Sequence, residues 1–326
     1  MAQQGKVVAV TGASGYIGTK LLERLEQEPF LRKLVAFDIN PPLVPIHNFA
    51  SYRKDVSQPI DEELNDQGAT TLVHLAFNAG RGANRREVEA ISQENLNTLR
   101  SVIASCLGSR IGHLIYLSSH TVYGAHRDNP VPIPDDAPRR PSLDYPYGYD
   151  KHLCELALEE FAQTQQNIKV TVLRSCIVLG YGADNAVTQS FFRPWLLGAS
   201  ENNPAMQFVY DDDLARVMSI IIQREIPGTF NLAGDGVVYY REMAKIIKSK
   251  LISLPSFLAY PLAQLSWEFH LQREATSRGL DLVRWPILMS TGKLHKATGY
   301  RFWHTGLDAL TAFANSAYLY KDPAPF

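Results

Sequence analysis

A tyrosine and a lysine stand four residues apart in the segment YPYGYDKHLCE, at Tyr147 and Lys151. If this segment is helical, the phenol and the ammonium lie on one face and can reach the same small target. A phenol has an ordinary pKa of about 10, and a neighbouring positive charge makes it easier to ionise. The pair therefore suits proton exchange with an alcohol, although the same spacing also occurs on helices that only face solvent.

Three glycines form a second group in the segment TGASGYIG, at Gly12, Gly15 and Gly18. A pyrophosphate needs a tight turn, a backbone that it can approach closely, and the N–H groups at the start of a helix. An apolar run precedes the loop and a helical pattern follows it, which is the context that a dinucleotide-binding loop requires. The alternative is an ordinary tight turn between a strand and a helix.

Asp38 ends the second apolar run. A carboxylate there can accept hydrogen bonds from the adenosine ribose and would repel a 2′-phosphate, which favours NAD over NADP as the cofactor. The opposite preference would follow if Arg32, Lys33 or Arg53 approached that phosphate. Asp55, after the third strand, is either a contact on the adenine side or a loop cap.

The elements that must position these residues alternate along the first half of the chain. Runs typical of buried parallel strands are KVVAV, LVAF, TTLVHLAF, HLIYLSS and KVTVLRS. Between them, residues 16–27 and 86–107 place their apolar side chains on one helical face. We expect an α/β fold, a doubly wound parallel sheet of the Rossmann type, with its ligand crevice beyond the carboxyl ends of the strands.

The regular pattern weakens after about Arg174, and helical patterns resume at residues 213–224 and 240–251. We assign residues 1–174 to an NAD-binding Rossmann domain that carries the catalytic residues. Residues 175–326 are assigned mainly to a smaller C-terminal substrate-binding lobe, with segments near 208–235 returning to the Rossmann core.

Composition is that of an ordinary globular protein, with 45% hydrophobic residues, 20% charged residues and a formal net charge of −1. It gives no electrostatic footprint for nucleic acid. The spacing of Cys106, Cys154 and Cys176 does not suit a metal site, and reduced thiols in a cytoplasmic protein are expected. The stretch Leu251 to Leu271 contains two prolines and polar residues, so we expect a helical lid or an interfacial contact rather than a stable membrane span.

Taken in order, the motifs resemble the extended short-chain dehydrogenase/reductases, which include the NAD-dependent epimerases and dehydratases. The resemblance covers most of the chain and rests on TGASGYIG, HLAF, YLSSHTVYG, YGYDK, VLRSCIVLG, and FVYDDDLARVM followed by GTFNLAG. It implies that Tyr147 is the general acid/base, that Lys151 acidifies it and holds the nicotinamide ribose, and that Ser119 orients the substrate. Ser118 is the nearest rival of Ser119, and a strand-end cap is the alternative role for either serine.

The resemblance also implies the remaining site residues. Expected cofactor contacts are Gly12, Ser14, Gly15, Tyr16, Ile17, Gly18, Asp38, Asp55, Val56, Leu75, Ala76, Phe77, Asn95, Tyr147 and Lys151. Expected substrate contacts are Ser119, His120, Arg174 and Ile177. Asn95 lies on the buried stripe of its helix and is either an organiser of the lysine environment or a satisfied core amide. No metal site is expected.

Two departures from the family pattern bear on the substrate. Sugar dehydratases carry an Asp-Glu pair after the catalytic serine or threonine, whereas this chain has His120 and Thr121. Nucleotide-sugar enzymes commonly carry an asparagine where this chain has Ile177. A less polar alcohol is therefore favoured, and the aromatic residues that line its site or fill the core are Phe191, Phe192, Trp195, Tyr210, Tyr260 and Trp267.

Three functions follow from these observations. The first is an NAD-dependent oxidoreductase that moves hydride between nicotinamide and a secondary alcohol or ketone. The second is a nucleotide-sugar epimerase that reduces NAD only transiently, and the third is a non-catalytic NAD-binding sensor or assembly protein. A small-molecule substrate is the expected partner, together with a second copy of the chain bound through the helices at 85–107 and 147–164.

Overall fold

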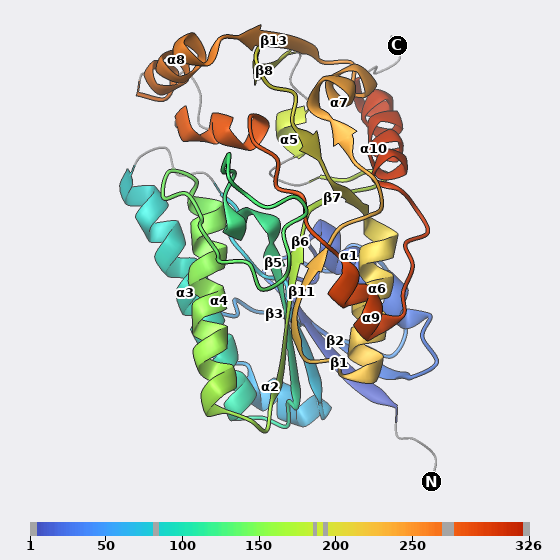
Figure 1. Ribbon diagram of the computed structural model, residues 1–326. Helices are drawn as coiled ribbons and strands as arrows, with labels where there is room; N and C mark the ends of the chain where they lie inside the picture. Colours follow the sequence, from blue (N-terminus) through green and yellow to red (C-terminus); the bar gives the residue numbers. More distant parts are fainter. Residues whose placement is uncertain (1–4, 81–84, 185–187, 192–194, 269–276, 322–326) are drawn as a thin grey trace.

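The computed structural model describes residues 5–80, 85–184, 188–191, 195–268 and 277–321. A seven-stranded parallel sheet in the order β11-β6-β5-β4-β1-β2-β3 forms its centre (Figure 1). The strands are β1 (Lys6–Thr11), β2 (Leu31–Asp38), β3 (Phe49–Arg53), β4 (Thr71–His74), β5 (His113–Ser119), β6 (Lys169–Ser175) and β11 (Gly228–Leu232). The strand order reverses between β1 and β4, which is where such sheets bind ligands. The doubly wound Rossmann sheet is thus confirmed.

Helices cover both faces of the sheet (Figure 1). One face carries α1 (Tyr16–Glu26), α6 (Asp211–Arg224) and α9 (Gly292–Thr298), and the other carries α2 (Asp61–Gln67), α3 (Arg85–Leu107) and α4 (Pro146–Thr164). Successive side chains of a strand point to opposite faces. In β1, Val8 and Val10 therefore join the core under α1 and α6, while Val7 and Ala9 join the core under α3 and α4.

The rest of the chain forms a smaller lobe, which lies at the top of Figure 1. Its paired strands are β7 (Ile177–Leu179) with β10 (Phe208–Tyr210), β9 (Ala205–Met206) with β12 (Val238–Tyr239), and β8 (Trp195–Ala199) with β13 (Lys250–Leu254). Its helices are α5 (Thr188–Phe191), α7 (Tyr240–Ile246), α8 (Ser256–Glu268), α10 (Gly306–Lys321) and the 3-10 helix η2 (Ser277–Val283). A separate apolar cluster around Phe208, Met243 and Phe313 holds the lobe together.

The segment after α7 differs from the helical pattern of the sequence. The helix predicted for residues 240–251 ends at Ile246, and Lys248 adopts a left-handed φ of 52° before β13 begins. The next residues pair with β8 as far as Leu254, because Pro255 lacks an N–H group and restricts the residue before it. Among the described residues, no helix has the length and apolar character needed to cross a membrane.

All three cysteines lie in the core. Cys106 lies in the last turn of α3, Cys154 lies in α4, and Cys176 follows β6. Burial raises the pKa of the Cys106 thiol to about 12 and also raises the pKa values of the other two thiols. The reduced, buried thiols expected from the sequence are compatible with these positions.

Candidate functional site

The glycine loop connects β1 to α1 without room for larger residues. Gly12 has a φ of 68°, and a Cβ atom there would come within 2.6 Å of the Ala76 nitrogen. A Cβ atom on Gly18 would come within 2.2 Å of the Gly12 carbonyl oxygen. Gly15 is the N-cap of α1 and offers no side-chain cap, so the N–H groups of the first turn depend on another acceptor.

Asp38 fixes the position of this loop against the end of β2. Its Oδ2 accepts a hydrogen bond from the Ser14 N–H at 2.9 Å, and its Oδ1 accepts one from the Asn40 N–H at 2.9 Å. Each carboxylate oxygen has a second lone pair with which to accept from a ribose hydroxyl. The carboxylate therefore fits the ribose-binding role expected for it.

The basic residues near β2 separate into two groups. Arg32 and Lys33 lie at the start of the strand, far along it from Asp38, and Lys33 bonds Gln67. Arg53 pairs in register with Asp38 and donates from Nε to the Ile39 carbonyl oxygen at 2.9 Å. Of these three residues, only Arg53 lies beside Asp38.

Asp55 and Val56 follow β3. The Asp55 Oδ1 accepts a hydrogen bond from the Ser57 N–H at 2.9 Å, which is the loop-capping arrangement. Val56 is buried in the core beneath α2 and α3. Contact of either residue with adenine stays a prediction.

The residues after β4 join the glycine loop to the candidate catalytic helix. The Leu75 N–H donates to the Thr11 carbonyl oxygen, and Ala76 lies against Gly12. The ring of Phe77 meets the ring of Tyr147 edge-on, with 5.5 Å between centroids. The Lys151 Nζ lies 3.7 Å from the Phe77 centroid. The segment Ala76–Phe77 therefore connects the glycine loop to Tyr147 and Lys151.

Tyr147 and Ser119 come together where α4 begins and β5 ends. The Ser119 Oγ accepts hydrogen bonds from the Thr121 N–H at 3.2 Å and the Thr121 Oγ1 at 2.9 Å. Burial raises the pKa of the Tyr147 phenol, the nearby Tyr145 raises it further, and hydrogen bonding with the Ser119 side chain lowers it in part. The phenol and the serine hydroxyl can therefore share one substrate oxygen.

Lys151 lies one turn further along α4 and is buried. Its Nζ donates to the Leu117 carbonyl oxygen at 2.8 Å and lies 5.9 Å from the centroid of the Tyr147 ring. Burial lowers the pKa of Lys151 to about 8. Burial has the largest effect on the pKa of the Tyr147 phenol and raises it. That Lys151 acidifies Tyr147 stays a prediction.

The two neighbouring serines of β5 have different surroundings. The Ser118 Oγ donates to the Glu155 Oε1 at 2.5 Å inside the core. Ser119 faces Tyr147 and the short 3-10 helix η1 (His120–Tyr123). Because alternate residues of a strand point to opposite faces, only one of the two can serve this site.

Asn95 links α3 to the loop after β4 and to α4. Its Oδ1 accepts from the Asn78 N–H at 2.8 Å, and its Nδ2 donates to the Asn78 carbonyl oxygen at 3.0 Å. The same Nδ2 lies 3.4 Å from the Asp150 Oδ2, and Asp150 also accepts from the Ser92 hydroxyl at 2.6 Å. Asn95 is thus a satisfied amide that also restrains the residue before Lys151.

Arg174 lies in a buried ion-pair network. Its Nη2 lies 2.7 Å from the Glu155 Oε2, and its Nη1 donates to the Tyr123 hydroxyl at 2.7 Å and the Asp135 carbonyl oxygen at 2.9 Å. The guanidinium is therefore bonded within the protein. Contact of Arg174 with a substrate stays a prediction.

His120 and Ile177 lie at the carboxyl edge of the sheet. The His120 Nδ1 is 3.2 Å from the Ser175 carbonyl oxygen and 3.5 Å from the Ser119 Oγ. Burial lowers the pKa of His120 to about 4, so the imidazole is neutral near pH 7 and is a poor proton donor. Ile177 starts β7 and packs against the core of the lobe.

His74 and Tyr116 are site residues that the sequence analysis missed. The His74 Nδ1 lies 2.7 Å from the Thr11 Oγ1, and the His74 ring stacks on Tyr116. Burial, followed by the charge of Lys151, lowers the pKa of His74 to about 3. The Tyr116 centroid is 4.7 Å from the Lys151 Nζ. Both residues stand inside the strand motifs HLAF and YLSS, but only the fold brings them to the lysine.

The expected aromatic residues lie in different places. Phe191 is in the core of the lobe, Trp195 is 43% exposed, and Tyr260 belongs to α8. The side chains of Phe192 and Trp267 lie outside the described residues. Tyr210 stacks on His304 at the start of α6.

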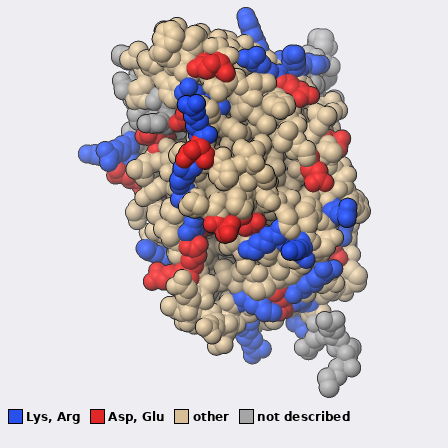
Figure 2. Space-filling model, in the orientation of Figure 1, with Lys and Arg blue, Asp and Glu red and all other residues tan. Residues whose placement is uncertain are grey.

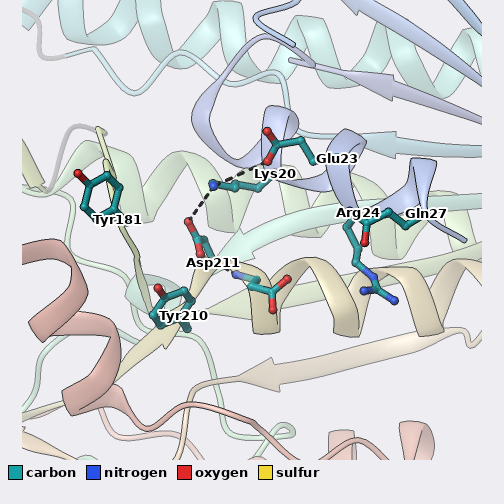
Figure 3. A pocket seen from close by; sticks show the side chains of 8 residues that line it. Lys20, Glu23, Arg24, Gln27, Tyr181, Tyr210 and Asp211 are labelled. Carbon is teal, nitrogen blue, oxygen red and sulfur yellow. Dashed lines mark hydrogen bonds and ion pairs between the residues drawn. The ribbon is translucent and has the colours of Figure 1, made fainter. Parts of the chain in front are cut away.

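Tyr210 also lines a cleft of about 210 Å³ between α1 and α6 (Figure 3). The Lys20 Nζ points into this cleft and lies 3.9 Å from the Asp211 Oδ2, which also accepts from the Tyr16 hydroxyl at 2.5 Å. The cleft lies on the α1 and α6 face of the sheet, opposite the face that α4 covers. The Tyr16 side chain thus connects the glycine loop to α6.

The chemistry of these residues fits a dinucleotide. The uncapped start of α1 suits a pyrophosphate, Asp38 suits a ribose, and the carboxyl edge of the sheet leads from there to Ser119 and Tyr147. Within the part of the chain that the structure describes, no cluster of His, Cys, Asp and Glu could hold a metal ion.

Comparisons with known proteins agree with this arrangement. A sequence model of the NAD dependent epimerase/dehydratase family matches residues 8–233. An uncharacterized protein of Mycobacterium bovis is 22% identical over 313 residues, covering 94% of this chain and 83% of the relative. Human 3 beta-hydroxysteroid dehydrogenase type 7 is 27% identical over 262 residues, covering 73% of this chain and 69% of that protein.

The fold also matches solved structures. UDP-glucuronic acid 4-epimerase from Bacillus cereus, in complex with NAD, superposes with a TM-score of 0.74 at 16% identity. The match covers 97% of this chain and 100% of the epimerase. At this identity the likeness concerns the fold alone.

Proposed function

Because this chain belongs to the NAD-dependent epimerase/dehydratase family, we propose that it moves hydride between NAD and a secondary alcohol or ketone. The observation that carries the proposal is the meeting of Tyr147 and Ser119 at the carboxyl end of β5, with Lys151 on the next turn of α4. Phe77 joins these residues to the glycine loop. A sensor or assembly protein would have no need of this arrangement.

The proposed roles follow from the chemistry of each group. Bound NAD would supply the hydride acceptor, and reduced cofactor the donor. The Ser119 hydroxyl, itself held by Thr121, orients the substrate oxygen, and Tyr147 takes or gives the proton at that oxygen. Lys151 is buried as a positive charge beside this phenol, and its charge favours the phenolate once the proton leaves.

The burial of the phenol has a consequence for the direction of proton transfer. Because its pKa lies above the ordinary value of about 10, Tyr147 is fully protonated near pH 7. The resting protein is therefore prepared to donate a proton to a ketone oxygen. Alcohol oxidation requires the phenol to be made more acidic when the site is filled, and the nearest cation for this task is Lys151.

The substrate class is proposed from two observations. Ile177 stands where nucleotide-sugar enzymes commonly carry an asparagine, and the human relative is a hydroxysteroid dehydrogenase. Both support a secondary alcohol on an apolar carbon skeleton. We also propose a homodimer through α3 and α4, where Leu107 and Leu156 are 52% and 43% exposed.

The test is the replacement Tyr147→Phe. It should lower kcat/KM by about a hundredfold to ten-thousandfold, since it removes the proton donor and leaves the glycine loop and Asp38 intact. The affinity for NAD, measured by calorimetry, should stay within about twofold. Tyr149→Phe is the matched control, because Tyr149 lies two residues away on the same helix and its ring pairs with His152.

Substrate screening with this pair of variants separates the three functions. Net NADH formation with hydroxysteroids or other secondary alcohols supports the dehydrogenase. Inversion of a UDP-sugar with no net NADH would replace it with the epimerase. Turnover that survives Tyr147→Phe would exclude the acid/base role, and NAD binding without turnover of any compound in the parent protein would favour the sensor.

A further inference from the structure

Helix α8 carries large apolar side chains on the outside of the protein. Phe257 is 75% exposed, and Leu258, Leu262 and Leu265 are 46%, 54% and 48% exposed. The three leucines stand at positions i, i+4 and i+7, so they form one stripe along the helix. Helix α8 contains no charged residue before Glu268. This stripe is a continuous apolar surface of the kind that marks an interaction site.

The opposite face of α8 holds the helix in this orientation. Ala259 and Ala263 are buried, and the Tyr260 hydroxyl donates to the Asp281 Oδ1 of η2 at 2.5 Å. The Arg284 Nη1 approaches the same hydroxyl at 3.5 Å. A surface helix ordinarily turns its large apolar residues inward. Here two small residues face inward and the large ones face outward. To bury the stripe, the helix would have to rotate and break the contacts of Ala259, Ala263 and Tyr260.

Basic residues precede the stripe in the chain. The ten residues from Arg241 to Lys250 contain four cations and one anion, and Arg241, Lys245, Lys248 and Lys250 are all exposed. They belong to α7, to the turn after it and to β13, which leads into α8 through Pro255. Figure 2 shows blue side chains along the upper edge of the molecule, and a red patch separates them from the tan area at the upper left, where α8 lies in Figure 1.

We propose that α8 and the basic segment 241–250 together dock on the surface of an anionic lipid bilayer. The apolar stripe would enter the boundary between headgroups and acyl chains, and the lysines would lie at the level of the anionic headgroups. With 13 residues, α8 is too short to span a bilayer, which takes about 20. It lies along the surface instead.

A second copy of the chain suits this surface less well. A stable protein interface buries about 800 Å² on each partner. A helix of 13 residues is only about 20 Å long and offers four large side chains. Pairing two such faces would also bring the basic segments of two copies toward each other, whereas an anionic bilayer attracts them.

The experiment is co-sedimentation of the full chain with vesicles. One set is phosphatidylcholine, and in the other part of the lipid is replaced by phosphatidylglycerol. The protein should bind the anionic vesicles, and binding should weaken as salt rises. Leu262→Glu should lower the partition coefficient about tenfold or more, since it removes an apolar side chain from the bilayer and adds a negative charge.

Two further variants separate the parts of the surface. Lys245→Gln with Lys250→Gln should reduce binding to anionic vesicles and its dependence on salt, and leave binding to phosphatidylcholine unchanged. Leu307→Glu is the matched control, because Leu307 is 44% exposed on α10, on the other side of the lobe (Figure 1). It should bind like the parent protein, and all variants should unfold at the parent temperature.

Three outcomes would overturn the proposal. The first is that the parent protein does not bind either kind of vesicle. The second is that Leu262→Glu binds as well as Leu307→Glu. The third is that the parent self-associates without lipid and Leu262→Glu abolishes this, which would assign the stripe to a contact between two copies of the chain.

Discussion

Asp38 holds the glycine loop against the end of β2, and its charge supports the proposed preference for NAD. Its two oxygens accept the N–H groups of Ser14 and Asn40, so the loop and the end of β2 are held together through a negative charge. In the proposed NAD complex this charge would repel a 2′-phosphate, and Arg53 pairs in register with Asp38. We therefore propose that the cofactor preference depends on the balance between these two side chains.

At this scale we predict the effect of Asp38→Ser. Removal of the charge should weaken NAD binding about tenfold, since a hydrogen bond to a charged group contributes about 1.5–3 kcal/mol. Affinity for NADP should rise, because Arg53 then has no competing carboxylate. Calorimetric titration with both cofactors measures the change, and Asp66→Ser, at an exposed position of α2, is the control. A cofactor preference that stays the same in Asp38→Ser would show that Asp38 does not contact the ribose.

The sequence was enough to predict which residues form the candidate site, but not what surrounds each of them. Tyr147, Lys151 and Ser119 follow from spacing and motif, and the structure brings them to one edge of the sheet. The position of the Lys151 ammonium could not be foreseen, because its partners come from other parts of the chain. They are the Leu117 carbonyl oxygen and the Tyr116 ring of β5 and the ring of Phe77, which follows β4. The burial that raises the pKa of Tyr147 is likewise a property of the assembled sheet.

Helix α4 has two separate duties along its length. Its first turns present Tyr147 and Lys151 to the site, and the next turn inserts Glu155 into the core beneath the sheet. Glu155 forms ion pairs with Arg174 of β6 and with Arg139 of the loop before α4. The helix that carries the proposed catalytic pair is therefore anchored by a buried ion pair, which fixes its position relative to β5 and β6.

We predict that Arg174→Met lowers the free energy of unfolding by about 3–5 kcal/mol, because it leaves Glu155 as a buried charge with one cation fewer. Glu159→Gln is the matched control. Glu159 also lies in α4 and forms an ion pair with Arg139, but its side chain is 47% exposed. Removal of this ion pair should therefore lower the free energy of unfolding by about 1 kcal/mol or less. Denaturant titration measures both. Equal losses in the two variants would mean that the buried pair does not anchor α4.

Elements with a strong apolar period were predictable, and those with short or mixed patterns were not. The strands of the main sheet contain uninterrupted apolar runs, which is why β1, β2, β4, β5 and β6 could be recognised. The first residues of strand β13 were predicted as the end of a helix. Their apolar and polar side chains do not alternate clearly enough to distinguish the period of a strand from that of a helix. Its pairing with β8, far away in sequence, decides its structure.

On the scale of the whole molecule, two cores share one sheet, and the residues buried in them include titratable side chains. Burial lowers the pKa of His74 to about 3 and the pKa values of His113 and His120 to about 4. All three imidazoles are therefore neutral in the folded protein. An unfolded chain would protonate them below a pH of about 6.5.

This difference predicts loss of stability in acid. A group whose pKa is lowered by folding contributes its full stability above the unfolded pKa, and loses it as the pH falls toward the folded pKa. Stability is lost from about pH 6.5 down to about pH 4 for His113 and His120, and down to about pH 3 for His74. Each histidine adds a slope of up to about 1.4 kcal/mol per pH unit. His113→Asn should reduce the slope of the free energy of unfolding against pH by the contribution of one histidine. An unchanged slope would show that His113 titrates alike in both states.

Burial of the three cysteine thiols also has a practical consequence. Cys106, Cys154 and Cys176 lie in the core, and burial raises the pKa of each, so hardly any nucleophilic thiolate is present in the folded protein. Alkylating reagents and mild oxidants can then modify them only while the interior is transiently open. The rate at which a reagent labels these native cysteines therefore reports how often the core opens, and no cysteine has to be introduced for the measurement.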